Sequence, residues 1–370
     1  MEKHNESQNI IKKSSFWKPK QLLAGPAYFF GRTGSGKSWS MMTIAQVYHS
    51  ALNYKIFDIN GGKYKESGFW CFPSDEIGLW RKYENKVGIM KNKGPKQYKV
   101  NLLFPCFSSK IPKKLPQHLP NITCKLFTLY FKDISPEEIT LITGDLSKNS
   151  TFLWNKIIKD LPNNANGIDI DNYIKKKYPK HINTTLYKLF IQPAIENNLL
   201  MGKKFYLNLD LLEECKEREV ISVLMHEFIP NNTWEMFIIH YIQRKILFDL
   251  ASKDKIPKNN IGLFREAGDY MKKTDKDLQN FEQVQIFRNK LTNIIRYGRR
   301  GFISFLDTQS PADTKNIVEG QEDLLCIKEI SIIDVDDILT KLRTERRISK
   351  TIRDRFYNLG LEEIVIVERK

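Results

Sequence analysis

Short apolar segments alternate with helical patterns at the beginning of the chain. Gly25–Phe30 (GPAYFF) predicts a buried strand, and apolar residues at 41, 44, 47 and 51 have the spacing of a helix that begins after Ser38. Tyr54–Asn60 (YKIFDIN) predicts a second short strand, which ends near Asp58 and a glycine turn. Strand, helix and strand in this order form a βαβ unit, which is typical of a parallel sheet.

The same alternation returns near residue 260. Asn259–Met271 and Gly301–Pro311 predict a third and a fourth core strand, and Phe281–Gly298 between them predicts a helix with apolar positions 281, 284, 287, 291 and 294. The intervening chain is less regular. We expect strands at Lys99–Phe104 and Cys124–Ser135, with Ser135 beginning a helix whose first position is proline, and mainly helical structure from 150 to 250.

The composition is that of a globular protein with a strongly basic balance. The 370 residues contain 59 Lys and Arg against 43 Asp and Glu, a net charge of +16, which indicates a polyanionic partner such as nucleic acid. The alternative interpretation is a solvated, lysine-rich surface. The five scattered cysteines have no metal-ligand spacing, the polar N-terminus lacks a secretory signal, and no apolar run is long enough for a membrane span. We therefore expect a cytoplasmic protein, in the host cytoplasm if it comes from a virus or plasmid.

The candidate chemistry begins at GRTGSGKS, residues 31–38, which matches the phosphate-binding pattern G-x-x-x-x-G-K-[ST] completely. It follows a predicted strand and opens a predicted helix, so backbone N–H groups and the helix dipole point at a bound phosphate. Lys37 is expected to reach the β- and γ-phosphates and Ser38 to bind Mg²⁺. The residues predicted to bind ATP are Gly31, Arg32, Thr33, Gly34, Ser35, Gly36, Lys37, Ser38 and Trp39.

Taken in order, several stretches resemble the HerA/FtsK superfamily of DNA-pumping ATPases. The resemblance covers about a quarter of the chain. It rests on the P-loop at 31–38, IFDINGGKY at 56–64, FKDISPEEI at 131–139, IGLFREAGDYM at 261–271 and RYGRRGFISFLDTQSPADTKNIV at 296–318.

The resemblance implies an α/β fold: a RecA-like P-loop NTPase core, with a mainly parallel sheet flanked by helices and a largely helical insertion. The expected divisions are a flexible basic arm at 1–20, the first part of the core at 21–145, the insertion at 146–255, the second part of the core at 256–330, and a basic helix and strand at 331–370.

The resemblance also implies residue roles. Glu266 matches the glutamate that polarises the attacking water, and Gln309 matches the glutamine that senses the γ-phosphate. Arg299 or Arg300 would stabilise γ-phosphate charge in a neighbouring subunit, and Asp58 would help to hold water or Mg²⁺. As alternatives, Glu266 is a helix cap or surface carboxylate, Gln309 ends a strand, and Asp58 belongs to a turn.

One departure concerns hydrolysis itself. Arg265 stands where the family has an aspartate on the Mg²⁺ side, and an arginine competes electrostatically with a cation. Lys63 also departs from the family pattern, because the family often has an acidic residue at that position. Either Asp58 or Asp269 takes the role of the missing aspartate beside Mg²⁺, or hydrolysis is slow, or ATP is bound without turnover.

The family resemblance implies an ATP-driven double-stranded DNA translocase that forms a homo-oligomeric ring and acts in genome packaging, plasmid transfer or DNA processing. Basic clusters that could follow the DNA backbone without sequence preference are Lys91, Lys93, Lys96 and Lys99 with Tyr98, and the segment Lys341–Arg355. Solvated helix charge explains any one cluster equally well. The alternative function is a non-hydrolysing, ATP-gated DNA-binding or assembly factor.

Overall fold

One sheet runs through the molecule. The computed structural model describes residues 22–59, 70, 98–105, 121–197, 199, 210–268, 281–309, 324–328 and 364–368. The strands in these ranges are β1 (Ala27–Phe30), β2 (Lys55–Asp58), β3 (Lys99–Pro105), β4 (Ile122–Phe127), β5 (Val220–Leu224), β6 (Asn260–Phe264), β7 (Ile303–Thr308), β8 (Leu324–Ile327) and β9 (Val365–Glu368). They pair in the order β4-β3-β5-β2-β6-β7-β1-β8-β9, and every pair is parallel except β8 with β9.

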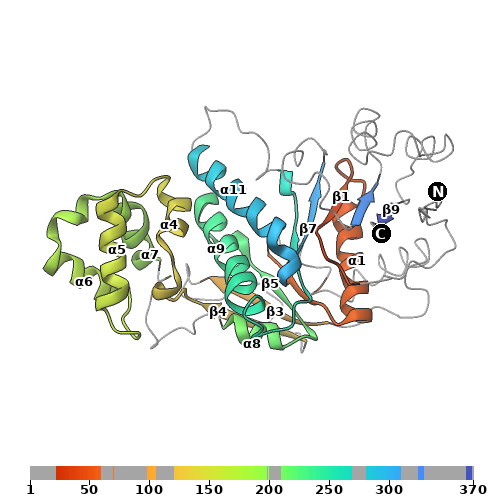
Figure 1. The fold of residues 1–370 in the computed structure, drawn as a ribbon, viewed down its shortest axis with the longest axis horizontal. Coiled ribbons are helices and arrows are strands. Elements are labelled where there is room, and N and C mark those ends of the chain that lie inside the picture. The colour runs from red at the N-terminus through yellow and green to blue at the C-terminus, as the bar shows by residue number, and fades with distance from the viewer. Residues whose placement is uncertain are drawn as a thin grey trace, which may run out of the picture.

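Helices cover both faces of this sheet. The α-helices are α1 (Lys37–Leu52), α4 (Pro136–Thr143), α5 (Lys148–Asp160), α6 (Gly167–Lys177), α7 (Gln192–Glu196), α8 (Leu211–Lys216), α9 (Asn232–Arg244) and α11 (Phe281–Tyr297). Shorter 3₁₀ turns are η1 (Phe131–Asp133), η2 (Pro179–Asn183), η4 (His226–Phe228) and η6 (Gly298–Arg300), and π-helical segments are η3 (Leu186–Ile191) and η5 (Lys245–Ala251). Figure 1 shows α9 and α11 lying across the sheet, with α1 beside β1.

The alternation of side chains along β1 and β7 separates two hydrophobic cores. Phe29 and Phe305 pack with α1 in one core, whereas Tyr28 and Leu306 face the other core with α9 and α11. A strand that is covered on both faces buries every side chain, so its sequence is continuously apolar. The sequence of β1, AYFF, is an example. These observations confirm the predicted P-loop α/β fold with a mainly parallel sheet.

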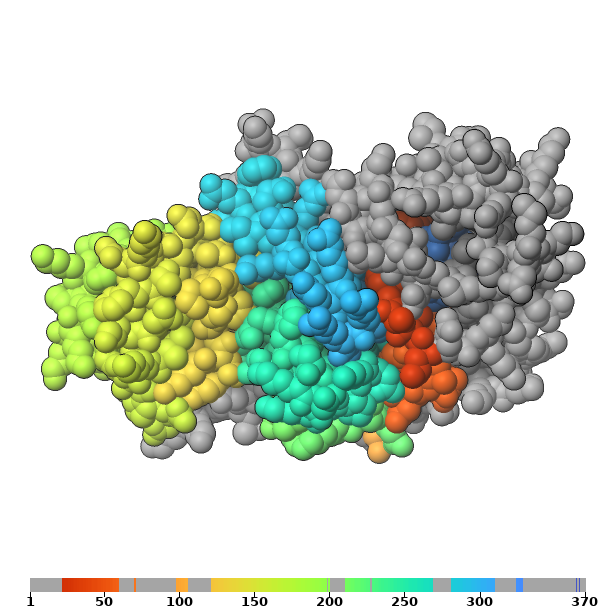
Figure 2. All heavy atoms as spheres, in the orientation of Figure 1, coloured from red at the N-terminus to blue at the C-terminus, as the bar shows by residue number. Residues whose placement is uncertain are grey.

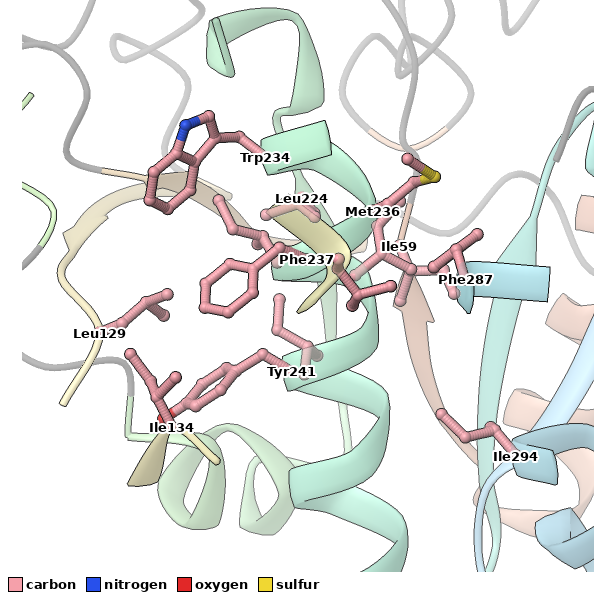
Figure 3. Close-up of a cluster of buried hydrophobic side chains, with 14 of the residues drawn as sticks. Ile59, Leu129, Ile134, Leu224, Trp234, Met236, Phe237, Tyr241, Phe287 and Ile294 are labelled. Atoms are coloured by element: carbon pink, nitrogen blue, oxygen red, sulfur yellow. The ribbon is translucent and has the colours of Figure 1, made fainter. Parts of the chain in front are cut away.

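A helical lobe extends from the β4 end of the sheet. It contains α5, α6, η3 and α7, and it lies at the left of Figures 1 and 2. Its buried side chains, including Trp154 and Phe190, belong to the same core as those of α9. Figure 3 shows that Trp234, Phe237 and Tyr241 project from α9 toward the segment that carries Leu129 and Ile134. The lobe and the sheet therefore share one continuous core through α9.

Local signals correctly predicted several elements. The strands β1, β2, β6, β7 and β9 and the helix α11 lie within the predicted segments, whereas β3 ends one residue later and α1 begins two residues earlier than predicted. Ser135 begins α4 as expected, because its hydroxyl accepts from the Glu138 N–H at 3.3 Å and the Glu138 carboxylate accepts from the Ser135 N–H at 2.9 Å. Pro136 at the first helical position needs no hydrogen-bond donor.

Two predictions differ from the structure. Within the range 146–255, expected to be mainly helical, β5 is a central strand between β3 and β2. Tyr98, which we grouped with lysines that could follow the DNA backbone, is 6% exposed and packs against Trp70 and His49 at ring distances of 5.5 and 5.9 Å. The lysines of that cluster and the basic segment 341–355 lie outside the described residues, apart from Lys99 at the start of β3. The domain divisions stay a prediction.

Candidate nucleotide-binding site

The P-loop leaves β1 and turns directly into α1. Gly34 and Gly36 both have φ of 80°, a left-handed conformation that glycine adopts without steric cost, and Gly36 is the residue that begins α1. A Cβ atom on Gly31 would lie 2.4 Å from the Ser35 Oγ, so a larger residue there would force the Ser35 side chain to move. The Ser35 N–H closes the loop by donating to the Arg32 carbonyl at 3.1 Å.

The outer rim of the loop is accessible. Arg32, Thr33 and Gly34 are exposed, and Ser38 and Trp39 are partly buried. Apart from its chain neighbours, no described residue has an atom within 4 Å of the Cβ position of Gly34. The amino terminus of the 16-residue helix α1 opens on the same loop. A phosphate group placed there would meet backbone N–H groups and the positive end of the helix dipole. The conformation therefore suits the nucleotide contacts predicted from the sequence.

Lys37 and Glu266 meet across the loop. The Lys37 Nζ donates to the Glu266 Oε1 at 2.9 Å, although the two residues are 229 positions apart in the chain. Lys37 is buried, whereas 44% of the Glu266 side chain is exposed, so water can reach this carboxylate. Glu266 follows β6 and has φ of 47°, an uncommon conformation for a residue other than glycine. The structure thus brings together the two residues predicted to hold the phosphates and to polarise water.

Asp307 lies beneath these two residues and was not among the predicted site residues. It belongs to β7, is fully buried, and accepts a hydrogen bond from the Glu266 backbone N–H. The Ser38 side chain also hydrogen-bonds to it, and Lys37 lies close enough to act on its charge. Burial raises the pKa of Asp307 from 3.8 to about 6, and the Ser38, Lys37 and Glu266 N–H interactions oppose that rise. The available sequence signal was an aspartate directly after the apolar run FISFL, near the end of a predicted core strand.

Arg265 and Asp58 form a separate ion pair on the same side of the sheet. The Arg265 guanidinium donates to the Asp58 carboxylate, and both side chains are almost completely buried, at 7% and 0% exposure. The Trp70 Nε1 also donates to Asp58, at 2.9 Å. The carboxylate that we expected to help hold Mg²⁺ is therefore already neutralised by the arginine that departs from the family pattern.

The other predicted residues occupy opposite edges of the sheet. Gln309 directly follows β7 at the carboxyl edge, where the P-loop also lies, and its side chain is exposed. Arg299 and Arg300 belong to η6, which precedes β7, so they lie at the amino edge. Arg300 stacks over the Tyr297 ring at 4.9 Å. Because six residues of β7 separate the two edges, these arginines do not reach the P-loop of their own chain.

The oxygen atoms beside Ser38 fit a hard divalent cation. The Asp307 Oδ2 is buried and has no hydrogen-bond partner among the described residues. Carboxylate and hydroxyl oxygens are ligands that Mg²⁺ prefers, and a nucleotide would add phosphate oxygens. Within the same described residues, no group of three or more His, Cys, Asp or Glu side chains could hold a metal ion by itself.

This fold and this site define a P-loop NTPase. The family model described as "Helicase HerA, central domain" matches residues 29–352, and the chain belongs to that family of P-loop ATPases. Family membership confirms the resemblance inferred from the motifs. None of the curated protein sequences compared with the chain matches it.

Several solved structures are similar to the chain at low sequence identity. VirB4 of Thermoanaerobacter pseudethanolicus is 12% identical over 93% of this chain and 89% of that protein, with a TM-score of 0.49. The bacterial conjugative coupling protein TrwB is 10% identical over 97% and 87%, also at 0.49. B204, the DNA-packaging ATPase from Sulfolobus turreted icosahedral virus, is 16% identical over 45% of this chain and 69% of that chain, with a TM-score of 0.26.

Among the helices of the described ranges, none has both the length and the apolar composition that a membrane span requires.

Proposed function

We propose that this protein binds ATP with Mg²⁺ at the P-loop, hydrolyses it, and uses the cycle to move double-stranded DNA. The observation that carries the proposal is the 2.9 Å contact between Lys37 and Glu266. A phosphate-binding ammonium and an accessible carboxylate at one point are the two protein groups that phosphoryl transfer to water requires there. The place of action would be the cytoplasm.

The residues act in sequence. The backbone N–H groups of the P-loop bind the β-phosphate, and Lys37 exchanges its contact with Glu266 for the phosphates. The freed Glu266 carboxylate then orients a water molecule and accepts its proton. When bound, Mg²⁺ neutralises phosphate charge, and Ser38 would help to hold it. Gln309, at the same edge of the sheet, would sense the γ-phosphate and its loss.

A ring of identical subunits would complete the site. Arg299 and Arg300 lie at the amino edge of the sheet, away from the P-loop of their own chain. In a ring, the amino edge of one subunit would face the nucleotide of the next, where either arginine would stabilise γ-phosphate charge in trans. The net charge of +16 supports a phosphodiester backbone as the moving partner, bound without sequence preference. Such a motor would act in genome packaging, plasmid transfer or DNA processing.

Phosphate release is the direct test. We expect Mg-ATP turnover that duplex DNA stimulates, with the stimulation decreasing steeply as salt concentration rises. The double variant Lys37→Ala, Glu266→Gln should abolish release, whereas Lys176→Ala, an exposed lysine on α6, should leave it unchanged. Equal turnover by the double variant and the wild type would refute the assignment of the site.

The second candidate function is an ATP-gated DNA-binding or assembly factor that does not hydrolyse ATP. Arg265 favours it, because an arginine stands at the position where the family has a Mg²⁺-side aspartate. This alternative predicts ATP-dependent DNA binding with no phosphate release, with or without duplex DNA.

A further inference from the structure

We propose that Asp307 is the protein carboxylate that works with Ser38 to hold the Mg²⁺ of the bound nucleotide, and that Arg265 and Asp58 form an internal ion pair that takes no part in metal binding. This inference rests on the part of the proposed function that places a nucleotide at the P-loop. It does not require that the nucleotide be hydrolysed.

Strand register places Asp307 closer to the P-loop than either residue of that pair. β7 lies between β6 and β1, and Asp307 pairs with Phe29 of β1, two residues before the P-loop begins. On its other side, Phe264 pairs with Leu306, so the next row sets Arg265 beside Asp307. Adjacent strands are about 4.8 Å apart. Asp307 therefore stands one strand nearer the P-loop than Arg265, in the same row and on the same face of the sheet.

Pairing of charges leaves Asp307 as the available carboxylate. Lys37 is paired with Glu266, and Arg265 is paired with Asp58. Among the described residues, Asp307 takes part in no ion pair and its Oδ2 accepts no hydrogen bond, although the residue is completely buried. Native proteins rarely leave a buried carboxylate oxygen without a partner, because the loss of hydration is costly. A cation bound beside Ser38 would supply that partner.

The second oxygen of Asp307 links this position to the water-activating residue. Its Oδ1 accepts the backbone N–H of Glu266, the residue with φ of 47°. That hydrogen bond compensates the unfavourable backbone conformation, and the conformation directs the Glu266 side chain toward Lys37. One carboxyl group thus holds the turn that carries Glu266, hydrogen-bonds to Ser38, and keeps its Oδ2 without a hydrogen-bond partner among the described residues. The Asp58 Oδ1 is also buried without a hydrogen-bond partner among the described residues, but the Asp58 carboxylate accepts from Arg265 and Trp70, neither of which belongs to the P-loop.

The test is the metal dependence of nucleotide binding. Affinity for a fluorescent ATP analogue would be measured with Mg²⁺ and with EDTA, so that no hydrolysis is needed. For Asp307→Asn, we expect the increase in affinity that Mg²⁺ gives the wild type to fall about 10- to 100-fold, with little change in EDTA. The double variant Asp58→Asn, Arg265→Met removes that ion pair without leaving a lone charge, and it should keep the full Mg²⁺ effect. The control Asp254→Asn changes an exposed aspartate with φ of 55° and should behave as wild type.

The outcomes separate this inference from the proposed function. A Mg²⁺ effect retained in Asp307→Asn, or lost in the Asp58 and Arg265 double variant, overturns the inference while hydrolysis by the wild type still supports the proposed function. If only Asp307→Asn loses the effect of Mg²⁺ on nucleotide affinity, the inference is supported. If the wild type in the same experiments releases no phosphate, the proposed ATPase activity is rejected.

A measurement on the native side chain covers the case in which Asp307→Asn does not fold. Wild-type protein with ¹³C-carboxyl aspartate and Mn²⁺-nucleotide should show electron–nuclear coupling between the metal and an aspartate carboxyl. The coupling should persist in the double variant that lacks the Asp58 carboxylate. Its absence from the wild type overturns the inference.

Discussion

The Lys37 ammonium lies 2.9 Å from the Glu266 carboxylate, so the phosphates of a nucleotide and this carboxylate compete for the same charge. In the proposed cycle, a bound nucleotide would draw the Lys37 ammonium away from this carboxylate and onto the phosphates. The same exchange would release Glu266 to interact with water. A single ion pair would then connect occupation of the P-loop with activation of the carboxylate that we propose to be catalytic.

This competition predicts opposite effects on binding and on turnover for Glu266→Gln. Without the negative charge, Lys37 is free to meet the phosphates, so ATP should bind as tightly as in the wild type or several-fold more tightly. Hydrolysis should fall by about 10²- to 10⁴-fold, because the amide cannot accept the proton. Fluorescent-nucleotide titration and phosphate release measure the two effects, with the exposed Glu196→Gln as the control. Weaker binding together with normal turnover would contradict the assignment.

The buried pair of Arg265 and Asp58 predicts a non-additive effect on stability. Arg265→Met leaves the Asp58 carboxylate buried without its ion-pair partner and should lower the free energy of unfolding by about 3–5 kcal/mol. Adding Asp58→Asn removes that charge and should recover most of the loss. Denaturant unfolding of the two single variants and the double variant measures the coupling. Additive losses would show that the pair does not act as a unit.

The Phe302 ring packs so closely against Gly262 in β6 that a side chain at this position should destabilise the protein. A Cβ atom there would lie 2.3 Å from the Phe302 ring, so Gly262→Ala should destabilise the protein by about 1–3 kcal/mol. Gly298→Ala is the matched control, because its added carbon would meet its nearest neighbour at 3.9 Å. Chemical unfolding compares them. Combination with Phe302→Leu should recover part of the loss in Gly262→Ala, and equal stability of the two alanine variants would contradict the packing argument.

Lys55 predicts a dependence of stability on pH. Burial lowers the pKa of Lys55 from 10.5 to about 8 in the folded protein, while its ammonium donates to the carbonyls of Glu217 and Val220. Between about pH 8 and 10.5 the unfolded chain holds the proton and the folded protein releases it, so this group makes stability rise with pH. Buried tyrosines such as Tyr98, whose pKa is raised by burial, act in the opposite direction above about pH 10.

The comparison with Lys55→Met isolates that contribution. The unfolding free energy of the wild type minus that of Lys55→Met should increase from pH 8 toward pH 10.5, because the tyrosine contributions cancel in the difference. A difference that stays constant across this range would show that Lys55 does not titrate as its burial implies.

The elements around the P-loop could be predicted because their signals are local. Glycines at 34 and 36, the lysine beside them and the apolar strand before them define the loop without knowledge of the rest of the fold. Glu266 was found through the family resemblance, since a carboxylate after an apolar strand has no spacing relation to the P-loop. Long-range contacts decided the rest. Asp307 reaches its position only when β7 pairs between β6 and β1. The order of strands in the sheet cannot be predicted from the sequence of any single segment.

β5 and the pair of Arg265 with Asp58 illustrate the same limit. VISVL is a short apolar run with helices on both sides, and periodicity alone does not separate such a strand from a buried helical turn. Arg265 indicated a departure from the family pattern. Its partner became evident only from the parallel pairing of β2 with β6, which brings Asp58 to the same edge.

The most direct test is a structure of the full chain with Mg²⁺ and a non-hydrolysable ATP analogue. We predict that the Lys37 ammonium lies on the phosphates and that Gln309 lies near the γ-phosphate. The Glu266 carboxylate should have turned away from Lys37 toward a water molecule beside that phosphate. A nucleotide bound elsewhere, or an unbroken contact between Lys37 and Glu266 with the nucleotide in the P-loop, would contradict the account.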